Sequence, residues 1–112
     1  MPEPLHPNRF HCVVEDVDAE IAHVRPFGEL DLATATTLES MLHAARERGL
    51  HRVVVDLRGL EFMDSTGLSL LARWSMRSRA AGYEFAVIPG RERIQRLFDL
   101  TGLSPHFTFI DG

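Results

Sequence analysis

The chain has 112 residues, of which 45% are apolar and 25% are charged, and its formal net charge is −4. This composition is typical of one soluble globular domain. It argues against a protein that binds nucleic acid directly, because such proteins usually carry a basic face. No apolar run approaches the roughly 20 residues of a membrane-spanning helix, and no signal-peptide pattern is present. We therefore expect a cytoplasmic protein that does not insert into membranes.

The first part of the chain predicts a tail and a hairpin. Residues 1–8 contain three prolines, and we expect a flexible N-terminal tail there, followed by a single domain at residues 9–112. Residues 9–18 and 19–27 are rich in β-branched side chains and have acidic residues between them, which predicts two paired strands. The sequence GELD at residues 28–31 breaks the strand pattern.

The first predicted helix covers residues 32–50. Apolar side chains recur there at i, i+3, i+4 and i+7, which is the spacing of one helix face. Asp31 is placed to act as its N-cap, and Gly49 is placed to end it.

A buried strand, a loop and a longer helix come next. RVVVDL at residues 52–57 is a continuous apolar run, typical of a central strand covered on both faces. Residues 58–63 are predicted to form a loop. The second helix then begins near Ser65 and runs to Gly82.

The C-terminal part predicts a strand at residues 83–88, a helix at 91–103 and a short strand at 106–110. The order β-β-α-β-α-β-α-β predicts an α/β domain, with a mixed sheet of about five strands flanked by helices. The expected sheet core contains Val13, Val53, Val54, Val55, Phe85, Val87 and Ile88.

This order places three strand-to-helix loops at one edge of the sheet. In open α/β sheets, ligands and partners bind outside the carboxyl ends of the strands, where such loops meet. Ser65 is therefore expected near the centre of a surface. Its charged neighbours there would be Glu29, Asp31, Arg58 and Arg91.

No catalytic constellation is evident, and we expect neither an enzyme nor a bound cofactor or metal. Ser65 lacks a G-x-S-x-G elbow, and a chain without lysine cannot form a P-loop. Asp56 ends a buried strand, and its carboxylate is expected to bind nearby backbone or Arg58. The six histidines are scattered without metal-ligand spacing. Cys12 lies in strand-like sequence, which favours a packed thiol over a reactive one.

The long second helix has an apolar arc wider than one contact with a sheet requires. Leu70 and Trp74 lie on a shoulder beside the face that should meet the sheet. Two interpretations remain open. Either the first helix covers this shoulder, or Leu70 and Trp74 form an exposed docking face beside Ser65.

Three segments carry a resemblance to a known family. They are GELDLAT at residues 28–34, VVVDLRGLEFMDSTGLSLL at 53–71 and LFDLTGLSPHFTF at 97–109. Together they resemble the STAS domain, and more narrowly the bacterial anti-sigma factor antagonists. The resemblance covers nearly the whole chain, and its D-S-x-G segment after a buried strand is the most specific part.

The resemblance implies a regulatory protein that acts by partner switching. It implies that the chain binds an anti-sigma factor that is also a serine kinase, that the sigma factor is thereby released, and that phosphorylation of Ser65 ends the binding. A PP2C-type phosphatase would restore the serine, and Thr66 is a rival acceptor. We expect the partner to bind the adjacent loops at this sheet edge and the start of the second helix, through Glu29, Asp31, Arg58, Asp64, Thr66, Gly67, Leu68 and Arg91. Leu68 also lies on the helix face that suits the core.

Some STAS domains have other roles. An adaptor subunit of a lipid-transport ABC ATPase has a similar motif, and other members are scaffolds that are not phosphorylated. These remain the alternatives to the antagonist. Which sigma factor and which signal are served, and whether the free protein forms a weak homodimer, are left open by the sequence.

Overall fold

The computed structural model describes residues 10–112, so the predicted tail at residues 1–8 lies outside the described part. The elements in chain order are β1 (His11–Asp16), β2 (Ile21–Leu30), α1 (Ala35–Glu47), β3 (Arg52–Asp56), a 3₁₀ turn (Leu57–Gly59), β4 (Leu60–Met63), α2 (Ser65–Ala81), β5 (Glu84–Ile88), α3 (Glu92–Thr101), a second 3₁₀ turn (Ser104–His106) and β6 (Thr108–Phe109).

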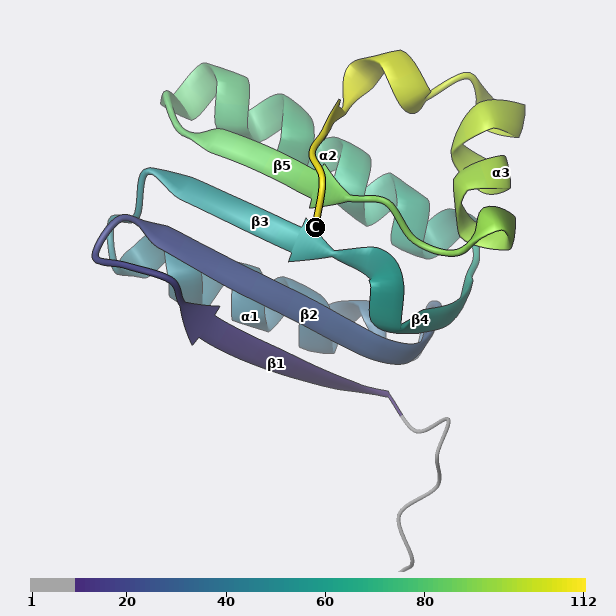
Figure 1. Cartoon of the computed structure of the whole chain (residues 1–112), viewed down its shortest axis with the longest axis horizontal. Helices are drawn as coiled ribbons and strands as arrows, with labels where there is room; N and C mark the ends of the chain where they lie inside the picture. The colour runs from purple at the N-terminus through teal and green to yellow at the C-terminus, as the bar shows by residue number, and fades with distance from the viewer. Residues whose placement is uncertain (1–9) are drawn as a thin grey trace, which may run out of the picture.

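The sheet is mixed and has six strands. Its main order is β1-β2-β3-β5-β6, and β4 pairs with β2 beside this path. β1 is antiparallel to β2, whereas the other pairs are parallel. The helices α1 and α2 lie behind the sheet, and α3 lies near the end at which β4 enters α2 (Figure 1). The opposite face carries no helix formed by residues 10–112. The predicted α/β architecture is confirmed.

The sequence pattern does not predict β4. Residues 58–63 were expected to be a loop and residues 28–31 a break, but β2 continues to Leu30 and pairs with β4. The pairing shifts by a residue between Gly28 and Glu29, and Gly28 has φ 93°, a conformation that glycine adopts readily. The bulge lets one long strand pair first with β3 and then with β4.

The core lies between the sheet and its helices. Six of the seven predicted core residues are buried, the exception being Val13, which is 38% exposed. β1 is an edge strand, and there Cys12 and Val14 turn towards the main core while Val13 turns to the helix-free face. Side chains alternate between the two faces of a strand, so an edge strand that buries one face exposes every second residue on the other. No helix within residues 10–112 is long and apolar enough to cross a membrane.

Candidate functional site

Two strand ends lie side by side at the sheet edge. In the parallel pair of β2 and β4, Leu30 is opposite Met63, and the Asp64 N–H donates to the Leu30 carbonyl at 3.1 Å. Asp31 and Asp64, which follow these paired residues, are therefore brought together although 33 positions separate them along the chain.

Asp64 caps helix α2. Its Oδ1 accepts the backbone N–H groups of Thr66 at 2.9 Å and Gly67 at 3.2 Å, and its carbonyl accepts from Leu68 at 3.1 Å. Ser65 is the first residue of the helix, and its side chain is exposed. Within residues 10–112, its hydroxyl has no hydrogen-bond partner. Because Asp64 supplies the cap, the Ser65 hydroxyl is not needed for capping and is free to react or to bind.

Asp31 makes the same local pattern before α1. Its Oδ1 accepts from the N–H groups of Ala33 at 3.0 Å and Thr34 at 3.2 Å. The Thr34 hydroxyl accepts from the Asp31 N–H at 2.9 Å and donates to the Glu29 carbonyl at 2.8 Å. The prediction that Asp31 is the N-cap was wrong, because its carboxylate organises the turn that precedes the helix and Thr34 occupies the cap position.

The residues after Ser65 turn inwards. Thr66 is half-buried, whereas Gly67 and Leu68 are buried, with Leu68 2% exposed. A Cβ at Gly67 would lie 2.8 Å from Cγ of both Leu30 and Met63, so glycine allows α2 to approach β2 and β4 closely. The expected surface patch therefore excludes Leu68, whose side chain packs in the core. Gly67 contributes close packing.

The surface around Ser65 carries carboxylates and apolar side chains. Glu29 is exposed and lies opposite Phe62 across the two strands, and Asp31 and Asp64 are half-buried at the adjoining strand ends. Phe62 is 41% exposed, and Leu32, directly after Asp31, is 77% exposed. Neither apolar residue was singled out from the sequence. Phe62 lies in the segment that the sequence predicts to be a loop, so its place on a paired strand opposite Glu29 is not evident from the sequence.

Arg91 and Arg58 lie on other segments than the carboxylates of this acidic edge. Arg91 is exposed and directly precedes α3. Arg58 precedes β4 whereas Ser65 follows it, so a strand of four residues, about 13 Å at 3.3 Å per residue, separates them along the chain. Partner binding by either arginine stays a prediction.

Arg58 is held by Asp56, as the sequence indicated. Its Nη2 lies 2.8 Å from Asp56 Oδ2, and both its Nε and its backbone N–H donate to Oδ1 at 3.0 Å. Burial raises the pKa of Asp56, but the Arg58 hydrogen bonds, with the charges of Arg58 and His23, outweigh burial and lower it overall. Arg25 Nε also lies 3.7 Å from Asp56 Oδ2. This charged cluster contributes to the helix-free side of the sheet.

The shoulder of α2 is covered. Leu70 is 1% and Trp74 3% exposed. The Trp74 indole N–H donates to Glu39 Oε2 of α1 at 3.0 Å. The His43 ring packs edge-on against the indole, with ring centroids 4.9 Å apart. Of the two interpretations, coverage by the first helix is correct, and Leu70 and Trp74 offer no docking face.

The described residues show no donor set for a metal ion. Across residues 10–112, no group of three histidine, cysteine, aspartate or glutamate side chains could hold one. Burial raises the pKa of the Cys12 thiol to about 11, which keeps it protonated and weakly nucleophilic at neutral pH. The exposed Ser65 hydroxyl beside the acidic edge suits binding and modification.

Known proteins are similar to this chain in sequence and in fold. A family model for the STAS domain matches residues 14–111. The anti-sigma-B factor antagonists of Staphylococcus epidermidis and of Staphylococcus aureus (strain NCTC 8325) are 40% and 36% identical over 80 residues, which are 71% of this chain and 74% of each relative. The crystal structure of an anti-sigma factor antagonist from Mycobacterium paratuberculosis matches with a TM-score of 0.82 at 30% identity, covering 96% of this chain and 90% of that one. The chain therefore belongs to the STAS domain family.

Proposed function

We propose that this protein is an anti-sigma factor antagonist that binds an anti-sigma factor and releases the sigma factor, and that phosphorylation of Ser65 switches the binding off. The names of the relatives support the antagonist role over that of an adaptor for a transport ATPase. The kinase activity is assigned to the anti-sigma factor, and removal of the phosphate to a PP2C-type phosphatase. This chain acts by binding and not by catalysis.

The observation that carries the proposal is the exposed, unengaged hydroxyl of Ser65. Asp64 accepts the N–H groups of Thr66 and Gly67, and within residues 10–112 the Ser65 hydroxyl has no hydrogen-bond partner, so its modification breaks no hydrogen bond there. A phosphate adds about −1.5 to −2 charges at neutral pH. A helix N-terminus tolerates added negative charge well, because the dipole and the N–H groups favour it there. The domain is expected to stay folded when phosphorylated.

At an interface the same phosphate has the opposite effect. Glu29, Asp31 and Asp64 already make this edge acidic, so a dianion at Ser65 adds to like charge and must lose water when a partner docks. An uncompensated buried charge costs about 3–5 kcal/mol, and about 1.4 kcal/mol is already tenfold in affinity. Phosphorylation should thus abolish tight binding without a large conformational change.

Binding and labelling experiments with the anti-sigma factors of the source organism test this proposal. Ser65→Ala should bind one of them like the wild type but take up no phosphate from ATP. Ser65→Asp should bind at least about tenfold more weakly. Mass spectrometry of the kinase-treated wild type should place the phosphate on Ser65.

Ser69→Ala provides the matched control, because Ser69 is an exposed hydroxyl one turn further along α2. It should bind and be labelled like the wild type. Phosphate on Thr66, or full labelling of Ser65→Ala, would show that Ser65 is not the acceptor. If no anti-sigma factor binds the wild type, the antagonist role itself is wrong.

A further inference from the structure

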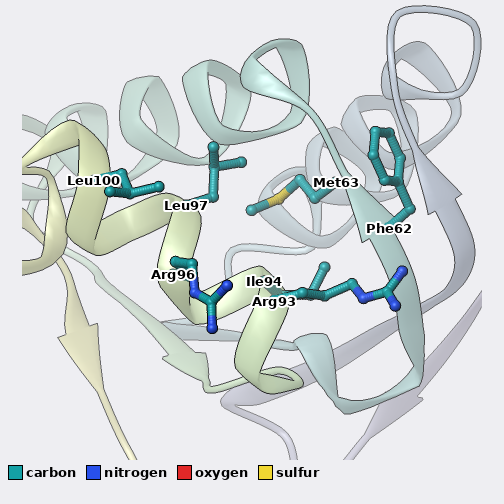
Figure 2. A pocket seen from close by; sticks show the side chains of 7 residues that line it. All are labelled: Phe62, Met63, Arg93, Ile94, Arg96, Leu97 and Leu100. Atoms are coloured by element: carbon teal, nitrogen blue, oxygen red, sulfur yellow. The ribbon is translucent and has the colours of Figure 1, made fainter.

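An apolar groove lies between β4 and α3, directly before the Ser65 site. Its volume is about 260 Å³, and its lining residues are Phe62, Met63, Arg93, Ile94, Arg96, Leu97 and Leu100. Figure 2 shows Phe62 and Met63 on β4 and the other five side chains on α3, with Met63 directed towards the helix. Since Met63 is two residues before Ser65, the groove and the hydroxyl belong to one continuous segment.

The groove exposes more apolar surface than folding requires. α3 buries Ile94 and Phe98 completely in the core, but Leu97 is half-buried and Leu100 is 77% exposed. Phe62, on the opposite wall, is 41% exposed. Exposed apolar side chains that gather around one groove are typical of an interaction site.

The charge at the rim is positive, in contrast to the acidic edge around Ser65. Residues 91–96 contain three arginines against one carboxylate, although the whole chain has a net charge of −4. Arg96 pairs with that carboxylate, Glu92, at 3.3 Å, but both side chains are well exposed, so the pair is weak and can exchange. Within residues 10–112, the Arg93 guanidinium has no ion pair. The rim is therefore suited to carboxylates of a partner.

The size of the groove indicates what can enter it. Sites for drug-sized ligands are about 300–1,000 Å³, and this groove lies below that range. It suits one or two apolar side chains. In protein interfaces such side chains fill pockets of this kind and carry much of the binding energy, while charged groups surround them.

We propose that the groove between β4 and α3 is a second contact for the anti-sigma factor, which inserts an apolar side chain flanked by carboxylates that meet Arg93 and Arg96. The inference rests on the proposed function, because it specifies how the same partner is held. It also gives the interface two halves: an acidic one at the strand ends and a basic, apolar one at α3.

The experiment measures the affinity of purified full-length variants for the anti-sigma factor that binds the wild type, by isothermal titration calorimetry. Arg93→Glu should weaken binding about tenfold, because it turns attraction at the rim into repulsion. Leu100→Ser should weaken it by roughly threefold to tenfold through loss of an apolar contact. Both positions are exposed on α3, so neither variant should change thermal unfolding much.

Two control variants on α2 match these changes. Arg77→Glu makes the same charge reversal at an exposed helix position, and Met76→Ser removes an apolar side chain that is 66% exposed. Both should bind within about twofold of the wild type, as expected for positions outside an interface. Changing an acidic residue of the anti-sigma factor to arginine should restore affinity for Arg93→Glu if that residue meets Arg93.

The outcomes separate the inference from the proposed function. If Arg93→Glu and Leu100→Ser bind like the wild type while Ser65→Asp does not, the groove is not a contact and the antagonist role stands. If the wild type binds no anti-sigma factor, both are wrong. If analytical ultracentrifugation shows a homodimer that Leu100→Ser disrupts while anti-sigma binding is unchanged, the groove holds a second copy and the inference is overturned.

Discussion

The starts of α1 and α2 are built alike and differ in what they expose. In each, an aspartate follows a strand and its Oδ1 accepts the N–H groups two and three residues later, at 3.0 and 3.2 Å for Asp31 and at 2.9 and 3.2 Å for Asp64. Three residues after Asp31 stands Thr34, whose hydroxyl is fully engaged. Three residues after Asp64 stands Gly67, which has no side chain to engage.

The difference shows how a reactive hydroxyl is kept available. One residue after each aspartate the side chain is exposed. This position holds Leu32 in the turn before α1 and Ser65 as the first residue of α2. A hydroxyl three residues after the aspartate is hydrogen-bonded within the turn, as at Thr34. A hydroxyl one residue after the aspartate faces solvent, as at Ser65. The sequence motif D-S-x-G thus combines a cap, an exposed hydroxyl and a close-packing glycine in four consecutive residues.

The largest effect is expected at a third aspartate that follows the same rule. Asp56 Oδ1 accepts the N–H two residues later, but this carboxylate is 3% exposed and is also bound by the Arg58 guanidinium. Asp56→Ala should lower the free energy of unfolding by about 2–3 kcal/mol, since hydrogen bonds to charged groups contribute about 1.5–3 kcal/mol each. Urea denaturation measures this, and an unchanged midpoint would contradict it.

Low pH should remove the stabilisation that the ionised Asp56 carboxylate gives to the fold. The pKa of Asp56 in the folded chain lies below its ordinary value of 3.8. A lowered pKa means that the ionised group stabilises the fold above pH 3.8, and that this stabilisation disappears as the pH falls through the folded pKa. The difference in unfolding free energy between the wild type and Asp56→Asn should therefore be constant from pH 7 to about 5 and shrink below about 4. If this difference in unfolding free energy grew as the pH fell, the ionised Asp56 carboxylate would not be the stabilising form.

A smaller loss is expected when Gly67 gains a side chain. The added Cβ of Gly67→Ala would lie 2.8 Å from the buried side chains of Leu30 and Met63. Because both side chains are packed in the core, the cost should fall in the upper part of the range for overpacking, about 2–3 kcal/mol. Alanine recovers about 1 kcal/mol of helix propensity. The net loss should be about 1–2 kcal/mol in urea denaturation. Thr66→Ala, in the same helical turn, should change stability by less than about 0.5 kcal/mol as the control.

The smallest effects compare the two caps directly. Asp64→Ala should cost about 1 kcal/mol, because loss of an N-cap costs about 0.5–2 kcal/mol. Asp31→Ala should cost about half as much, since Asp31 supports the turn before α1 and the Thr34 hydroxyl still binds the backbone there. Thermal unfolding of both variants tests the order. Equal losses would mean that the two starts are energetically equivalent.

The sequence predicted the elements whose signals are local. The helix from Ser65 to Gly82 follows from helical spacing and from a glycine that ends it with φ 79°, and the structure agrees. β4 was missed because its four residues are stabilised by pairing with the end of β2, some 30 positions earlier, and a pattern within one segment does not show such a partner.

The site was predicted in part for the same reason. Asp64, Ser65 and the glycine are adjacent in the sequence, so their geometry follows from helix capping alone. Whether Leu68 or Trp74 faced a partner depended on coverage by other elements, and the position of α1 buries Trp74. Val13 and its neighbours are all apolar, so their alternation did not reveal which face an edge strand would bury.

The exposed position after each aspartate has a consequence for timing. Leu32 and Ser65 follow neighbouring strand ends, and under the proposed function a protein docking at this edge meets both. Phosphorylation cannot alter Leu32, because no kinase modifies a leucine. The contact at Ser65 is lost when the hydroxyl is phosphorylated and regained when the phosphate is removed. Leu32 then contributes to partner specificity, and the phosphorylation state of Ser65 determines when the two proteins are bound.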